Sequence, residues 1–170
     1  MVRIAGALLL AGAGLWAGLE RGRVQARRVR ALREWAEALD LWARELAYCL
    51  PTTAQLLSAL AKRGPTGLKQ VFGQALAGLD RLGEQDFETI WQRALTDGET
   101  DLPDQELELL KRLGNVLGSC GWEDQHSAVE RVARQLERRG EILAQALVRE
   151  RKTWGVLGLS AGCALAILLL

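Results

Sequence analysis

The sequence has few of the residues that build β-strands, metal sites or disulfide frameworks. Its 170 residues include 33 Leu, but only nine Val, four Ile, seven Thr and three Phe or Tyr. Because strands favour β-branched and aromatic residues, whereas Leu and Ala favour helices, this composition predicts an all-α protein. One His and three widely spaced Cys (49, 120 and 163) leave little material for a metal site or a disulfide framework.

An excess of charge and the common catalytic motifs are also lacking. The 22 Lys and Arg nearly balance the 21 Asp and Glu, which argues against a dedicated nucleic-acid binder. None of the motifs GxxxxGK(S/T), HExxH and CxxC occurs. Nothing marks a pocket around His126, so we interpret it as a solvent-facing residue in the first turn of a helix. These absences favour a protein that is not an enzyme and has no metal or cofactor.

Two long runs without charge lie near the ends of the chain, at residues 4–19 and 154–170. Their lengths are close to the ~17–25 residues that span a bilayer, so we interpret 1–20 and 154–170 as transmembrane anchors. A buried core helix is the alternative for each run. A cleaved signal peptide is a further alternative for the first run, but six Arg follow between residues 21 and 33 and no convincing cleavage site does.

Basic clusters flank the inner end of both runs. Because positive charge stays on the cytoplasmic side, the middle segment 21–153 is predicted to be cytoplasmic, with both chain ends across the membrane. Each run also carries a GxxxG pattern, which lets helices approach closely in lipid; the residues are Gly14, Gly18, Gly158 and Gly162. Glycine is common in membrane spans, so chance is the alternative explanation of this pattern.

The middle segment reads as a string of helices. We expect them over 20–49, 52–63, 66–82, 86–97 and 122–152, with a further helix, the fifth in order, that opens at Pro103 and carries apolar positions as far as Leu117. Thr52 or Thr53 is expected to cap the second and Asp86 the fourth. The first and last carry apolar stripes spaced three and four residues apart, at positions 29, 32, 35, 39, 42, 46 and 49, and at 129, 132, 136, 143 and 147, with Gly140 between. Inward positions are 68, 71, 72, 75, 79 and 82 in the third helix, 87, 90, 91, 94 and 95 in the fourth, and 107, 110, 113 and 117 in the fifth.

This pattern predicts a bundle of about six helices, whose long first and last helices pack antiparallel and continue into the N-terminal and C-terminal spans. The alternative use of the two stripes is an intermolecular coiled coil, in a membrane-anchored structural protein that only oligomerises.

Negative charge is concentrated in one part of the middle segment. Residues 80–108 contain ten Asp or Glu but only Arg81 and Arg93 on the basic side, a net charge of −8. A surface of this kind steers a basic partner towards it, so we propose Glu99, Asp101, Asp104, Glu106 and Glu108 as partner-binding residues. An ordinary solvated face between two helices is the alternative.

Several short motifs, in order, resemble the stage III sporulation protein AB family of endospore-forming bacteria. They are Glu45-Leu46-Ala47-Tyr48 before a proline, Trp91 in the fourth helix, Leu117-Gly118-Ser119 with Gln125 after a polar stretch, and Trp154 with Gly158 at the start of a terminal apolar run. The sequence departs from the family pattern where Gly121 replaces an Asp, and where Leu50-Pro51-Thr52 replaces Thr-Pro-Leu. The resemblance covers essentially the whole chain.

The resemblance implies a function. The family's domain is similar to the cytoplasmic helical domain of the type II secretion platform protein F. A member is expected in the mother-cell-to-forespore channel complex, at the outer forespore membrane, with its domain in the mother-cell cytoplasm. By the same analogy it docks the cytosolic secretion-type ATPase, stage III sporulation protein AA, beside other membrane proteins of the complex.

Overall fold

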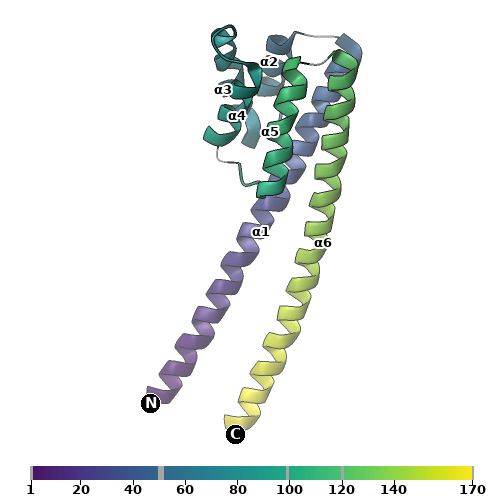
Figure 1. Cartoon of the computed structure of the whole chain (residues 1–170). Coiled ribbons are helices and arrows are strands. Elements are labelled where there is room, and N and C mark those ends of the chain that lie inside the picture. Colours follow the sequence, from purple (N-terminus) through teal and green to yellow (C-terminus); the bar gives the residue numbers. More distant parts are fainter. Residues whose placement is uncertain (1, 50–51, 99, 120, 170) are drawn as a thin grey trace. The chain divides into compact units, whose positions relative to one another are not determined.

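The structure is a computed structural model that describes the backbone of residues 2–49, 52–98, 100–119 and 121–169, and the side chains of residues 20, 22–48, 52–98, 100–118 and 121–150. Its described residues are all-α, as predicted (Figure 1). They form the six α-helices α1 (Val2–Cys49), α2 (Thr53–Arg63), α3 (Lys69–Gly78), α4 (Phe87–Asp97), α5 (Asp104–Ser119) and α6 (Trp122–Leu169), and the 3₁₀ helices η1 (Thr66–Leu68) and η2 (Leu79–Arg81).

The chain divides into two compact units. One consists of Met1–Val29 and Glu141–Leu170, and the other of Arg30–Gly140. The Arg30–Gly140 unit lies within the predicted 21–153 domain, and it contains α2 to α5 with the adjoining parts of α1 and α6.

The two predicted anchors lie outside the described side chains, apart from Glu20, and so do all four glycines of the GxxxG patterns. Among the helical segments whose side chains are described, none is both long and apolar enough to cross a membrane.

An aromatic cluster forms the centre of the Arg30–Gly140 unit. Trp35 and Trp42 of α1, Phe72 of α3 and Trp91 of α4 are each at most 1% exposed. Trp42 and Trp91 meet edge to face with ring centroids 5.6 Å apart, and Trp35 meets Phe72 in the same way at 5.7 Å. Such pairs contribute about 0.5–1.5 kcal/mol beyond the area that they bury, so this cluster fixes α3 and α4 on α1.

The apolar stripe of α1 and the first part of the α6 stripe are covered within the chain, as the bundle interpretation predicts. On α1 every described stripe position is buried. On α6 Val129 and Leu136 are buried, whereas Val132, Leu143 and Leu147 are half-buried. Gly140 would place a Cβ 3.5 Å from the Cβ of Leu32, so α6 lies against α1 there. The two helices run in opposite directions within this unit (Figure 1). The coiled-coil alternative is not supported for the buried positions of the two stripes, because the apolar surface that it needs is already covered there.

The second helix begins where the sequence predicts. Thr52 is the N-cap of α2, its hydroxyl oxygen accepts from the backbone N–H of Gln55, and the Gln55 side chain accepts from the N–H of Thr52. This reciprocal pair is a capping box, which satisfies two of the free N–H groups at a helix start.

The third helix is shorter than predicted, and its predicted inward face is wrong at one end. Instead of one helix over 66–82, the chain forms η1, α3 and η2 in succession. Leu79 is half-buried and Leu82 is 52% exposed. Gly83 follows with a φ of 115°, a left-handed conformation that favours glycine, so the chain turns away from the core before Leu82 can pack.

The fourth and fifth helices contain two further differences. Asp86 is the N-cap of α4 by position, but its side chain makes no capping hydrogen bond, so the predicted cap is wrong in its chemistry. Leu107 of α5 is half-buried, whereas its neighbour Glu106 is 4% exposed. Trp91 joins the two helices, because its indole Nε1–H donates to the carbonyl oxygen of Leu110 at 2.7 Å.

Candidate docking surface

The predicted partner-binding carboxylates that the structure describes lie on the segment that joins α4 to α5 and on the first two turns of α5. Asp101, Asp104 and Glu108 are exposed, and we call these three residues the acidic surface. Glu99 lies outside the described residues. The position of Asp104 in the first turn of α5 is favourable, because the N-terminal end of a helix carries partial positive charge.

Glu106 does not belong to this surface. Its side chain is 6% exposed, and its Oε1 accepts from Nε of Arg139 on α6 at 3.0 Å. The other carboxylate oxygen, Oε2, is buried and has no hydrogen-bond donor among the described residues. Glu106 therefore ties α5 to α6, and a partner protein cannot reach it unless the helices separate.

Glu108 is exposed but already has a cationic neighbour. Its Oε1 accepts from Nζ of Lys111 at 2.8 Å, one helical turn away. This hydrogen bond, together with the charges of Lys111 and Arg112, lowers the pKa of Glu108 below its ordinary value. The carboxylate is consequently ionised at neutral pH, and its charge is partly balanced within α5.

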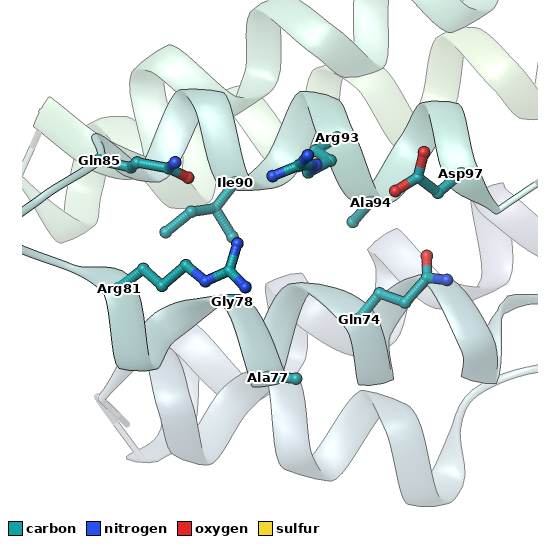
Figure 2. A pocket seen from close by; sticks show the side chains of 9 residues that line it. All are labelled: Gln74, Ala77, Gly78, Arg81, Gln85, Ile90, Arg93, Ala94 and Asp97. Carbon is teal, nitrogen blue, oxygen red and sulfur yellow. The ribbon is translucent and has the colours of Figure 1, made fainter.

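A groove that the sequence analysis missed lies between α3 and α4, at the other end of the 80–108 segment. It holds about 410 Å³ and brings together the only two cationic residues of that segment, Arg81 from η2 and Arg93 from α4 (Figure 2). We call it the arginine groove; its lining residues are Gln74, Ala77, Gly78, Arg81, Gln85, Ile90, Arg93, Ala94 and Asp97. Twelve positions separate the two arginines in the sequence, so no local motif indicates that they meet.

The described residues give little basis for chemistry at His126. It is half-buried and is the fifth residue of α6, so it is more covered than the solvent-facing position in a first turn that the sequence predicts. No group of three or more His, Cys, Asp or Glu side chains in the described part of the chain could hold a metal ion.

Three comparisons relate the chain to known proteins. The family described as stage III sporulation protein AB matches residues 3–170. Stage III sporulation protein AB of Bacillus subtilis (strain 168) is 26% identical over 172 residues, covering 100% of both chains. A solved structure of a stage III sporulation protein AB superposes with a TM-score of 0.63 at 24% identity, covering 72% of this chain and 97% of that chain, which supports the fold.

Proposed function

Because the chain belongs to the stage III sporulation protein AB family, we propose that it is a non-catalytic platform protein of the mother-cell-to-forespore channel complex. In this proposal residues 1–20 and 154–170 anchor it in the outer forespore membrane. Its helical domain faces the mother-cell cytoplasm, where it docks the cytosolic secretion-type ATPase of the complex.

The observation that carries the docking proposal is the acidic surface and its rigid support. α5 is fixed to α4 by the Trp91–Leu110 hydrogen bond and to α6 by the buried Glu106–Arg139 pair. Asp101, Asp104 and Glu108 are therefore exposed carboxylates on a supported element, and binding orders little additional chain. Complementary charge of this kind mainly raises the association rate.

The test is a triple charge reversal, Glu99→Lys with Asp101→Lys and Asp104→Lys. We expect association with the ATPase to slow by about tenfold at low salt, and the difference to shrink at 1 M salt, where the Debye length falls to about 3 Å. Surface plasmon resonance with the immobilised full chain measures the rate, and spore yield measures the consequence.

A matched control reverses three other exposed carboxylates, Glu37→Lys with Glu123→Lys and Glu137→Lys. These residues lie on α1 and α6 and form no ion pair with any described residue. Glu123 is in the first turn of its helix, so the control repeats the helix-dipole cost of Asp104→Lys. Equal binding by both triple variants at normal protein levels would favour the alternative, an ordinary solvated face.

A further inference from the structure

We propose that the arginine groove binds an acidic peptide segment of a partner protein, with a carboxylate held between Arg81 and Arg93. This site prefers ligands of the opposite charge to those of the acidic surface. It goes beyond the proposed ATPase contact and does not depend on it.

The guanidinium groups of Arg81 and Arg93 are both available to bind a ligand. Ten carboxylates lie in residues 80–108, yet neither Arg81 nor Arg93 forms an ion pair with a carboxylate among the described residues. Figure 2 shows both side chains reaching into the same space, one from each wall of the groove. Guanidinium groups bind carboxylates through charge-assisted hydrogen bonds, so two of them at one groove favour a carboxylate ligand.

The arginine groove is already formed before a ligand binds. Its floor includes Gly78 of α3 and Ile90 of α4, and a Cβ at Gly78 would overlap Cγ2 of Ile90. The two helices therefore approach closely beneath the arginines, and Ile90 is only 4% exposed. A ligand does not have to open this groove, which lowers the free-energy cost of binding.

The volume and the charges of the groove favour a peptide over a small anion. The groove volume of about 410 Å³ is more than ten times the roughly 30 Å³ that one water occupies in the liquid. Asp97 lies at the same end as Gln74 in Figure 2, where its negative charge disfavours a dianion such as phosphate. A single carboxylate on a polypeptide fits both the volume of the groove and the presence of Asp97.

The experiment titrates the purified full chain into a fluorescein-labelled octapeptide that carries two glutamates among glycine and serine. A second peptide carries glutamine at both positions. Fluorescence anisotropy is expected to show about tenfold tighter binding of the glutamate peptide, because it alone forms charge-assisted hydrogen bonds. Absence of that preference in the wild-type chain overturns the proposal.

Two double variants locate the site. Arg81→Gln with Arg93→Gln should abolish the preference for glutamate, whereas Arg131→Gln with Arg138→Gln should retain it within about twofold. The control arginines are exposed on α6, form no ion pair with a described carboxylate, and carry the same charge. An equal loss in both variants means that net charge alone attracts the peptide, and the proposal is then wrong.

A competition experiment separates the peptide from free phosphate. Inorganic phosphate is added at constant ionic strength, with sodium chloride as the reference. We expect it to displace the glutamate peptide no better than chloride does, because Asp97 opposes a second negative charge. Displacement by phosphate at concentrations below the dissociation constant of the peptide would make the groove a phosphate site instead. Circular dichroism of each variant confirms that the helices are intact.

Discussion

The carboxylates of the acidic surface and the two arginines of the arginine groove come from one stretch of chain, residues 80–108, but the two sites form in different ways. The carboxylates of the acidic surface are neighbours in sequence, within eight positions, and stay exposed because the chain there is a connecting segment and the start of a helix. The arginines of the groove lie on η2 and α4, and they meet only because α3 packs on α4. A run of like charge thus reveals the first kind of site, whereas the second kind depends on packing.

The largest expected effect comes from removing the contact that supports both regions. Trp91 belongs to α4, which provides one wall of the groove, and its hydrogen bond to Leu110 holds α5, which carries the acidic surface. Trp91→Ala should lower the free energy of unfolding by about 3–5 kcal/mol, because it leaves a cavity in the aromatic cluster. Urea denaturation of the full chain measures this loss.

Trp91→Phe is the control for this substitution. It keeps an aromatic ring at the centre of the cluster but removes the donor to Leu110, at a cost of about 1–3 kcal/mol. A Trp91→Ala protein as stable as the wild type would contradict the claim that one residue supports both regions.

A smaller effect distinguishes two glutamates that are two positions apart in α5. Glu106→Gln should destabilise the protein by about 1.5–3 kcal/mol, because it removes a charge-assisted hydrogen bond to Arg139 and leaves a buried amide incompletely paired. Arg139 is 47% exposed, so the loss stays below that of a fully buried ion pair. Thermal melting checks this difference.

Glu108→Gln is the matched control, because its carboxylate is exposed and its bond to Lys111 lies at the surface. Its melting temperature should change much less than that of Glu106→Gln, because an exposed ion pair contributes little to stability. If both substitutions are silent, Glu106 does not tie α5 to α6.

The contrast between Glu106 and Glu108 also shows which features of the structure can be predicted from the sequence. The existence of the helices, a threonine cap at the start of α2 and the α1 stripe follow from local rules, and the structure confirms them. The burial of Glu106 could not be predicted, since its partner Arg139 lies 33 positions away. The net charge of residues 80–108 does not indicate which face of a helix is covered, so Glu106 was predicted to be exposed like its neighbours.

The same limit explains the end of the third helix. The spacing of Leu79 and Leu82 continues the apolar pattern of α3, so periodicity alone extends the helix to Leu82. The chain instead tightens into η2 and turns at Gly83, where a positive φ is favourable. Arg81 reaches the groove from η2, and helical periodicity does not predict that 3₁₀ helix.

A substitution at Gly78 should change the arginine groove but not the acidic surface. Gly78→Ala places a Cβ against the branched side chain of Ile90, so α3 and α4 must separate slightly. We expect a loss of about 1–3 kcal/mol in unfolding free energy. We also expect a weaker preference for the glutamate peptide, since the two walls that carry Arg81 and Arg93 move apart.

Gly73→Ala on the same helix is the control, and its expected effect on the free energy of unfolding has the opposite sign. A Cβ at Gly73 meets nothing within 4 Å, so the substitution should stabilise α3 by about 0.5–1 kcal/mol. Stabilisation by both substitutions would show that the helices do not approach closely at Gly78, and that the groove floor is not fixed there.

The smallest effect concerns the titration of Glu108 within the acidic surface. The hydrogen bond from Lys111 lowers the pKa of this carboxyl below 4.5, followed by the charges of Lys111 and Arg112. A lowered pKa in the folded state stabilises the fold above the ordinary pKa, and this contribution disappears as the pH falls from about 4.5 through the folded value.

Side-chain carboxyl NMR of the full chain should therefore show Glu108 titrating at lower pH than an isolated glutamate. Lys111→Met should return its pKa towards 4.5, whereas Lys69→Met on α3 should leave it unchanged. A wild-type Glu108 that titrates at 4.5 or above would mean that Lys111 does not engage it, and that its full charge is available to a partner.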